Sequence, residues 1–334
     1  MNGVDWSAPR MVAANGMRLA VWEQGEGFPV VLCHGFPELA FSWRHQLPAL
    51  AAAGYRAIAL DQRGYGRTGG PAEISAYGMH ELAGDLAGLL DALGIERAVF
   101  AGHDWGGIVV WQLALLRPDR VAGVVALNTP FQPRGEQDLI SVLRRVFGEQ
   151  HYMVAFQEPG RAEAVFERDV ARVLDRMFRR PKTGGAVHIP LAERGRLMTL
   201  DALAGDGPAG GVPFLDPAEM AYFVDAFRRT GFRGGINWYR NLRRNWEATA
   251  AVPQHVAAPA LMVSAANDIF LPPSLTEGME RWVPRVERHT VPACGHWTQQ
   301  ERPEEVNRLL VNWLRRWFRP AQGLRLGGRA SGVR

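Results

Sequence analysis

The sequence has few cysteines and no long apolar run. Cys33 and Cys294 are the only cysteines among 334 residues, too few for a disulfide framework, so we expect reduced thiols and a cytoplasmic location. The longest stretch without a formal charge, 248–267, contains prolines, a glutamine and a histidine and therefore does not predict a membrane span. Residues 1–10 lack the apolar segment of a signal peptide. We therefore expect neither a disulfide-rich secreted protein nor a membrane-embedded one.

The charge distribution argues against a nucleic-acid partner. The formal net charge is +4, and residues 319–334 contain four arginines and no acidic residue. That segment accounts for the excess, and acidic and basic residues are mixed over the rest of the chain, so we expect no basic surface that binds nucleic acid. The same glycine-rich tail is predicted to be disordered. Hydrophobic residues make up 47% of the chain and charged residues 22%, which is typical of a globular protein.

Short apolar runs alternate with longer helical patterns along most of the chain. This alternation predicts an α/β fold with a mostly parallel sheet flanked by helices. The predicted strands are residues 18–22, 30–33, 56–60, 98–101, 124–127, 260–264 and 286–291. The clearest predicted helices, with apolar residues three and four apart, are 42–53, 80–93, 105–116 and 303–318.

The alternation stops in residues 131–254, which are richer in aromatic residues and arginine. This segment predicts helices without an obvious strand, so we interpret it as a helical cap inserted into an α/β-hydrolase core made of residues 1–130 and 255–318. Sites in α/β sheets lie beyond the carboxyl ends of the strands. A cap inserted at that edge would cover the site.

Residues 102–107 read Gly-His-Asp-Trp-Gly-Gly and join a predicted strand to a predicted helix. The pattern matches the nucleophile elbow G-x-S-x-G, in which small residues flank a strained turn that lifts the nucleophile out of the sheet. Asp104 stands where that pattern has serine. A carboxylate there predicts attack on an electrophilic carbon and a covalent ester on the enzyme. The alternative is a buried Asp104 that caps the helix beginning at Trp105.

A base and an orienting acid are predicted from the order of residues after the elbow. His296 follows the last predicted strand and Asp268 follows the strand 260–264, which matches the order nucleophile, acid, histidine. In that arrangement Asp268 would hold the tautomer of His296 and stabilise the imidazolium. A core histidine and a surface aspartate are the alternatives. An acid could also follow the strand 124–127, but that position holds Asn128.

Backbone N–H groups beside Asp104 are candidates for an oxyanion hole. Residues 34–37 read His-Gly-Phe-Pro and follow a predicted strand, so the N–H of Phe36 could point at the elbow together with that of Trp105. The side chain of His34 is as compatible with packing as with a role in the site.

Three tyrosines lie in the predicted cap, namely Tyr152, Tyr222 and Tyr239. Tyr222 belongs to an ordinary amphipathic pattern and is interpreted as packing. From the residues alone, Tyr152 and Tyr239 are also more typical of a core than of a catalytic site, and His103 is expected to pack beneath the elbow.

Several motifs, taken together, resemble those of the soluble epoxide hydrolases. They are residues 34–37, 102–107, 156–160 (Phe-Gln-Glu-Pro-Gly), 231–234 (Gly-Phe-Arg-Gly), 237–241 (Asn-Trp-Tyr-Arg-Asn) and 294–299 (Cys-Gly-His-Trp-Thr-Gln). The resemblance runs in order through core and cap, and the cap motifs are not shared by α/β-hydrolases at large. It implies the α/β-hydrolase fold with an inserted cap.

The resemblance implies a role for each matching residue. It makes Asp104 the nucleophile, His296 the base and Asp268 the acid. It also implies that Tyr152 and Tyr239 are paired hydrogen-bond donors to an epoxide oxygen, which reverses the packing interpretation of these two tyrosines.

The same resemblance implies where the substrate lies. The backbone N–H groups of Phe36 and Trp105 would form the oxyanion hole, and the peptide bond between Phe36 and Pro37 would be cis. The residues expected to contact substrate are Phe36, Trp105, Phe156 and Trp238. The family's reaction needs no metal or cofactor.

The implied activity is the conversion of a small apolar epoxide and water to a vicinal diol. A haloalkane dehalogenase is an alternative, because it shares Asp followed by Trp at the elbow and would hold halide with Trp105, but Phe36 cannot supply a second side-chain N–H. A catalytically silent α/β-hydrolase that only binds an apolar ligand is the other alternative. A monomer and a homodimer are both compatible with the sequence.

Overall fold

The structure is a computed structural model that describes residues 4–182, 190–205, 207 and 209–319. From residue 320 on, the tail predicted to be disordered lies outside the described residues. The strands are β1 (Arg10–Ala14), β2 (Met17–Gln24), β3 (Phe28–Cys33), β4 (Tyr55–Asp61), β5 (Ala98–His103), β6 (Val121–Leu127), β7 (Arg179–Arg180), β8 (Val212–Pro213), β9 (Ala260–Ala265) and β10 (Val286–Val291).

The helices follow the same order. The α-helices are α1 (Gln46–Ala52), α2 (Met79–Ala92), α3 (Trp105–Leu116), α4 (Leu139–Phe147), α5 (Tyr152–Ala155), α6 (Arg161–Phe166), α7 (Val170–Met177), α8 (Leu191–Leu197), α9 (Leu200–Ala204), α10 (Pro217–Thr230), α11 (Arg233–Arg240), α12 (Leu242–Ala248), α13 (Thr298–Glu301) and α14 (Pro303–Trp317).

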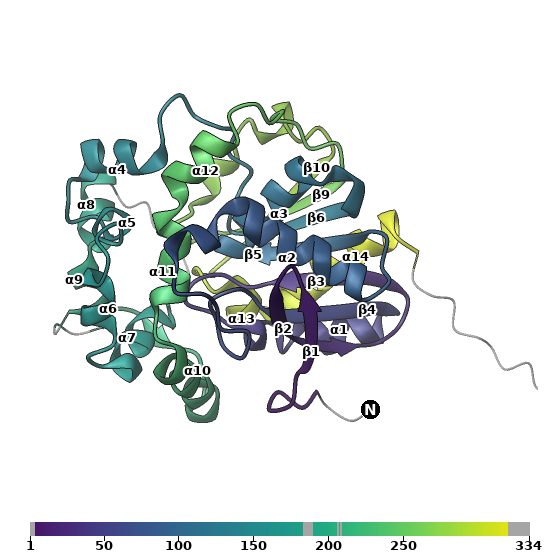
Figure 1. The fold of residues 1–334 in the computed structure, drawn as a ribbon, viewed down its shortest axis with the longest axis horizontal. Helices are drawn as coiled ribbons and strands as arrows, with labels where there is room; N and C mark the ends of the chain where they lie inside the picture. The colour runs from purple at the N-terminus through teal and green to yellow at the C-terminus, as the bar shows by residue number, and fades with distance from the viewer. Residues whose placement is uncertain (1–3, 183–189, 206, 208, 320–334) are drawn as a thin grey trace, which may run out of the picture.

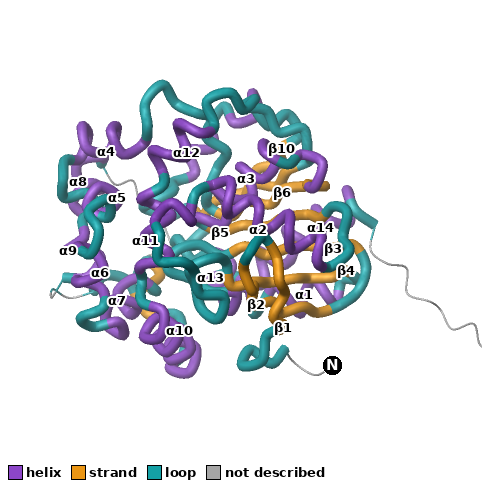
Figure 2. The backbone as a smooth tube through the Cα atoms, viewed as in Figure 1, coloured by secondary structure: helices purple, strands orange, loops and turns teal. Residues whose placement is uncertain are grey.

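One large sheet forms the centre of the molecule, with the strand order β1-β2-β4-β3-β5-β6-β9-β10. The strands from β4 to β10 in this order are parallel, and β2 and then β1 extend the β4 edge in antiparallel fashion. Figure 2 shows these strands as one twisted orange layer. The α/β fold with a mostly parallel sheet is confirmed, and each predicted strand is present.

β1 is a strand that the apolar pattern did not predict. It pairs with β2 across the two-residue turn Asn15-Gly16, whose φ angles are 48° and 74°. Asn-Gly suits a hairpin turn that needs positive φ at both residues. The sequence therefore did contain a local signal for this hairpin.

Helices cover both faces of the sheet. Leu47 of α1 and Leu310 and Trp313 of α14 pack on one face. Leu86 of α2 and Val109 of α3 pack on the other, where Figure 1 shows both helices lying over the strands. Strands buried between two such layers consist almost entirely of apolar residues, so the turns after the strands carry the chemistry.

The predicted helix 42–53 is wrong in one respect. The chain forms a short 3-10 helix, η1 (Ala40–Trp43), and then α1 begins at Gln46. Pro48 explains the break, because its ring nitrogen cannot donate to the carbonyl oxygen of Arg44 and proline is tolerated only in the first turn of a helix.

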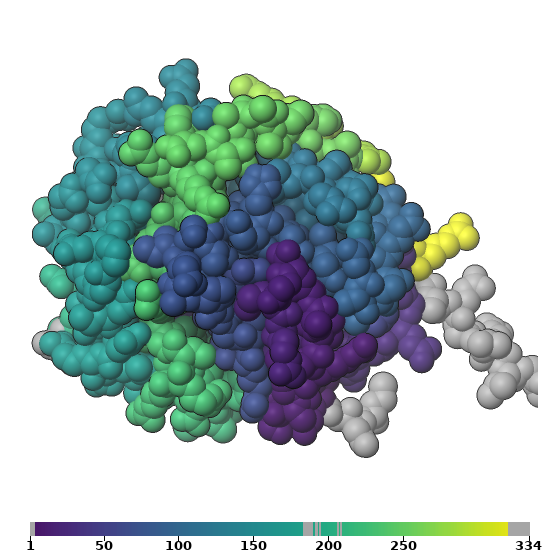
Figure 3. Space-filling model, viewed as in Figure 1, coloured from purple at the N-terminus to yellow at the C-terminus, as the bar shows by residue number. Residues whose placement is uncertain are grey.

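The helices α4 to α12 are inserted between β6 and β9, and we call them the cap. They form one side of the molecule, the teal and green part of Figures 1 and 3. The expectation of a segment without strands is wrong, because β7 and β8 pair antiparallel within it. Strands of two residues are too short to show an alternating apolar pattern.

Polar and aromatic contacts join the cap to the core. Trp238 Nε1 of α11 donates to the Arg63 carbonyl oxygen at 3.0 Å, and the largely buried Arg44 pairs with Glu219 of α10 at 2.6 Å. The Tyr239 ring of α11 lies 4.9 Å from the ring of Trp105, just after β5. The cap therefore covers the carboxyl ends of the central strands.

Candidate active site

Asp104 lies at the apex of the turn between β5 and α3. Its φ of 51° is in the left-handed region, which is unusual for a residue other than glycine. A Cβ at Gly102 would collide with the Gly106 carbonyl oxygen, and a Cβ at Gly106 would collide with the Cys33 carbonyl oxygen. The turn is therefore a nucleophile elbow in which the flanking positions admit only glycine.

The carboxylate of Asp104 does not cap a helix. Asp104 occupies the N-cap position of α3, but its side chain accepts no capping hydrogen bond from that helix. Its Oδ1 atom instead accepts the backbone N–H of Phe36 at 2.9 Å. The helix-cap alternative is thereby excluded, and the side chain points towards the cap side of the sheet.

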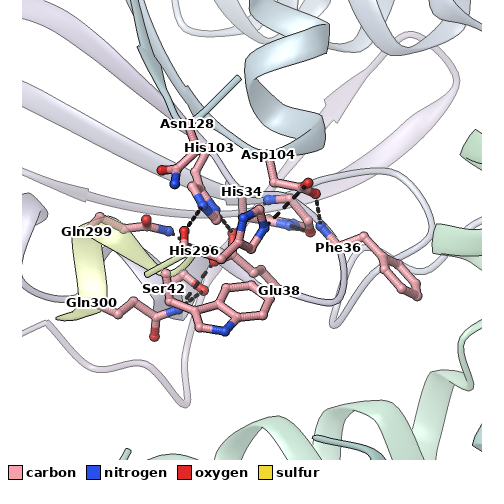
Figure 4. A network of polar contacts seen from close by, with 12 residues as sticks. His34, Phe36, Glu38, Ser42, His103, Asp104, Asn128, His296, Gln299 and Gln300 are labelled. Atoms are coloured by element: carbon pink, nitrogen blue, oxygen red, sulfur yellow. Dashed lines mark hydrogen bonds and ion pairs between the residues drawn. The ribbon is translucent and has the colours of Figure 1, made fainter. Parts of the chain in front are cut away.

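One backbone N–H contacts this carboxylate, and a second belongs to the next residue in the chain. The N–H of Phe36 already points at it, as Figure 4 shows. Trp105 is the first residue of α3, where N–H groups have no partner within the helix. The peptide bond between Phe36 and Pro37 is cis, as predicted. The geometry can stabilise negative charge that develops on an Asp104 oxygen.

His296 lies between the two aspartates. Its Nδ1 contacts Asp268 Oδ2 at 2.8 Å. Its Nε2 lies 3.6 Å from Asp104 Oδ2, a contact that Figure 4 shows. A carboxylate only accepts hydrogen bonds, so Nδ1 carries a proton. The structure thus brings together the three residues that the sequence predicted as nucleophile, base and acid.

The charges of this triad reinforce one another. Burial raises the pKa of Asp268, but the charge of His296 and several hydrogen bonds outweigh burial and lower that pKa to about 2. Burial lowers the pKa of His296, whereas the Asp268 and Asp104 carboxylates raise it, and the result lies well above the ordinary value. The two carboxylates therefore favour the imidazolium form of His296 in the resting site.

Tyr152 and Tyr239 approach this site from the cap. Their ring centroids are 5.9 Å apart, and Tyr239 also packs edge-on against Phe36 and Trp105. Burial, with the nearby Asp104 carboxylate contributing, raises the pKa of both hydroxyls. Both therefore keep their protons and can act as hydrogen-bond donors.

The two further aromatic residues predicted to contact substrate are fully buried. The Phe156 ring packs against Tyr152 and Tyr239 at 5.3 and 5.0 Å. Trp238 lies behind Trp105, with its indole N–H committed to the Arg63 carbonyl oxygen. Both support the aromatic wall of the site, and direct contact with substrate stays a prediction for them.

A buried polar network that the sequence reasoning missed lies beneath His296. The His103 ring contacts Glu38 Oε2 at 2.9 Å through Nδ1 and the His296 carbonyl oxygen at 2.7 Å through Nε2. Glu38 also accepts from the Gln299 and Gln300 amides of α13 (Figure 4). His103 packs beneath the elbow as expected, and it also connects Glu38 to the loop that carries His296.

Electrostatics hold this network together. Burial raises the pKa of Glu38, but the charge and the hydrogen bond of His103 outweigh burial and lower that pKa below its ordinary value. The carboxyl group therefore stays ionised. Both acceptors of His103 are oxygen atoms, which favours a donor on each ring nitrogen. In the sequence, the one feature that could have indicated this network is the position of Glu38, directly after the motif 34–37.

We expect Glu38→Gln to lower the free energy of unfolding by about 3–5 kcal/mol, because it leaves His103 without its buried counter-charge. Urea unfolding at neutral pH measures this loss. Glu305→Gln is the matched control, because Glu305 pairs with Arg308 on the surface, and exposed pairs contribute little. Equal stability of both variants would contradict a structural role for the network.

Two further residues singled out in the sequence, Tyr222 and His34, pack against neighbouring parts of the protein. Tyr222 stacks on Phe41, and its hydroxyl donates to the Trp6 carbonyl oxygen, so it packs as expected. His34 is buried and accepts the backbone N–H of Gln62.

Among the described residues, no three His, Cys, Asp or Glu side chains are placed to hold a metal ion. No described helix is long and apolar enough to cross a membrane.

Comparison with known proteins first defines the class. Residues 29–303 match the family described as alpha/beta hydrolase fold. Epoxide hydrolase A of Mycobacterium tuberculosis is 45% identical over 317 residues, which cover 91% of this chain and 96% of that protein. A crystal structure of epoxide hydrolase A from Mycobacterium thermoresistibile has a TM-score of 0.82 and 43% identity, over 92% of this chain and 98% of that one.

A mammalian relative is longer. Bifunctional epoxide hydrolase 2 of Rattus norvegicus is 41% identical over 302 residues, which are 90% of this chain but 54% of that protein. The chain thus spans about half the length of the mammalian relatives it matches. From these matches and the site geometry, the chain belongs to the epoxide hydrolases of the α/β-hydrolase fold.

Proposed function

We propose that this protein hydrolyses small apolar epoxides to vicinal diols through a covalent ester on Asp104. The observation that carries the proposal is a carboxylate at the elbow, paired with His296 and covered by Tyr152 and Tyr239 of the cap. In the first step Asp104 attacks one epoxide carbon and the carbon–oxygen bond breaks. The two tyrosines hydrogen-bond the leaving oxygen, one of them transfers its hydroxyl proton to it, and a hydroxyalkyl ester and a tyrosinate form.

In the second step the ester is hydrolysed. Once Asp104 is an ester it no longer carries charge, so the pKa of His296 falls. The imidazolium then releases its extra proton, which restores the tyrosine hydroxyl, and leaves a neutral imidazole. Neutral His296 then takes a proton from water, which attacks the carbonyl carbon of the ester. The N–H groups of Phe36 and Trp105 stabilise the tetrahedral oxyanion. Collapse of this intermediate releases the diol and regenerates the Asp104 carboxylate.

We assign residues 131–254 to the cap, which supplies the apolar walls of the substrate site, and residues 1–130 and 255–318 to the core. We also infer a cytoplasmic location, which the two free and buried thiols, Cys33 and Cys294, support.

Incubation with styrene oxide tests the proposed function directly. We expect phenylethanediol to form, and we expect no halide release from a chloroalkane or bromoalkane of similar size. Halide release without diol formation would favour a dehalogenase. Ligand binding without any turnover over a broad set of epoxides would favour the silent binding protein.

We expect Tyr152→Phe and Tyr239→Phe each to lower kcat/KM for styrene oxide by about 10²–10³-fold, because each removes a donor to the developing alkoxide. Steady-state diol formation measures the loss. Tyr222→Phe is the matched control, since its hydroxyl bonds Trp6 away from the site. Wild-type rates in both cap variants would remove the tyrosines from the mechanism.

We expect low pH to slow ester hydrolysis more than ester formation. His296 must be neutral to act as a base, whereas Asp104 attacks while its neighbour is an imidazolium, so the two steps respond differently to acid. Rapid-quench mass spectrometry should therefore find more ester at about pH 5.5 than at about pH 8. An ester fraction that rises with pH would contradict this assignment of protonation states.

A further inference from the structure

Asn128 occupies an unusual backbone position at the end of β6. Its φ is 65°, in the left-handed region, and the N–H of Thr129 donates to the Leu127 carbonyl oxygen at 2.8 Å, which closes a tight turn around it. Its own N–H donates to Val263 of β9 at 2.8 Å. Asn128 is 1% exposed, so its amide must find partners inside the protein.

Those partners are Asp268 and a residue of the segment that follows His296. Asn128 Nδ2 donates to Asp268 Oδ2 at 2.7 Å, and Asn128 Oδ1 accepts the Thr298 hydroxyl at 2.7 Å. The carboxylate can only accept, so the orientation of the amide is fixed by chemistry and a flipped amide would place oxygen against oxygen. Figure 4 shows Asn128 beside His103, on the side of the site opposite Phe36.

The oxygen that Asn128 contacts is the one that faces the base. Asp268 Oδ2 receives both Asn128 Nδ2 and His296 Nδ1, the latter at 2.8 Å. Asp268 Oδ1 is held separately by the N–H groups of Phe270 and Leu271 at 2.9 and 3.1 Å. Asn128 is therefore the side chain that directs the second oxygen of the carboxylate towards the imidazole.

The same amide also reaches the loop that carries His296. Thr298, which donates to Asn128 Oδ1, donates its own N–H to the His296 carbonyl oxygen at 3.0 Å. One buried amide thus connects the orienting acid to the segment of the base, although β6 carries neither residue.

We propose that Asn128 is a positioning residue for the second half-reaction, which aligns Asp268 and His296 for ester hydrolysis. The inference rests on the proposed function, because it needs an ester on Asp104. Attack by Asp104 requires no base, so loss of Asn128 leaves ester formation largely intact and slows ester hydrolysis.

The next residue, Thr129, provides a matched comparison. Its hydroxyl donates to the Asp104 carbonyl oxygen at 2.7 Å, so it supports the nucleophile and makes no contact with the acid. Both residues are buried in the same turn. General damage to the turn would affect Asn128 and Thr129 variants alike, whereas positioning of the acid would not.

The test compares single-turnover rates of ester formation and ester hydrolysis for Asn128→Ala, Thr298→Val, Thr129→Val and wild type, with styrene oxide. For Asn128→Ala we expect hydrolysis slower by about tenfold or more, as for loss of a hydrogen bond to a charged group, with formation changed little. Ester then accumulates, so kcat and KM fall together. Thr298→Val, which removes the hydrogen bond to Asn128 Oδ1 but keeps the one from Nδ2 to Asp268, should show a smaller effect of the same kind. Thr129→Val should accumulate no ester.

Thr298→Val carries the test if Asn128→Ala fails to fold. The inference is overturned if both variants keep the wild-type ratio of the two rates, or if Thr129→Val accumulates as much ester. It also falls if wild type turns over styrene oxide without an ester, an outcome that separately contradicts the proposed function.

Discussion

Replacing Asp104 with asparagine is expected to lower diol formation by about four orders of magnitude or more, because in the proposed reaction the ester forms on the Asp104 carboxylate and an amide is a poor nucleophile. Asparagine is the best replacement, since it has the same shape and tolerates the φ of 51° that Asp104 adopts. Steady-state turnover of styrene oxide measures the loss. The variant should unfold at nearly the wild-type temperature, which serves as the folding control.

An isotope experiment with wild type separates the ester route from direct attack by water. In a single turnover in heavy-oxygen water, the water oxygen adds to the Asp104 carbonyl carbon, so the label should enter the Asp104 carboxylate while the diol takes an unlabelled oxygen from Asp104. Label in the diol alone, together with an active Asp104→Asn variant, would show that water opens the epoxide directly.

The second large effect is expected for His296→Gln, which should trap the ester. Asp104 can still attack the epoxide, but no base activates water, so ester hydrolysis should slow by about 10²–10⁴-fold. Intact-protein mass spectrometry should then show one added substrate mass, and digestion should place it on the peptide that contains Asp104.

His289→Gln is the matched control for this variant, because His289 is an exposed histidine on β10. It should turn over at the wild-type rate without accumulating ester. If His296→Gln neither forms ester nor turns over, His296 is needed for attack and not only for hydrolysis. Full turnover by His296→Gln would remove it as the base.

Features that depend on residues adjacent in the chain could be predicted from the sequence. Gly102 and Gly106 around Asp104 identify the elbow because only glycine fits where backbone atoms approach so closely. The places of Asp268 and His296 follow from the apolar strands before them. The Asn15-Gly16 hairpin was equally local, and it shows that turn chemistry can reveal a strand where the apolar pattern does not.

The roles of the cap tyrosines needed more than local pattern. Tyr152 and Tyr239 lie 87 positions apart in the chain, and by spacing alone each resembles a core residue. Only the resemblance to a family suggested that they act together, and only the fold of the cap brings their rings to 5.9 Å from each other.

The sequence by itself thus determined the α/β class, the elbow and the places of Asp104, Asp268 and His296 at the ends of strands, because strands and tight turns leave local patterns. Tertiary structure alone decided the partners of the buried polar groups. Glu38 meets His103 across 65 positions and Gln299 across 261, and Asn128 meets Asp268 across 140. No periodic pattern encodes such pairs, because a buried polar side chain is specified by the atoms around it and not by its neighbours in the chain.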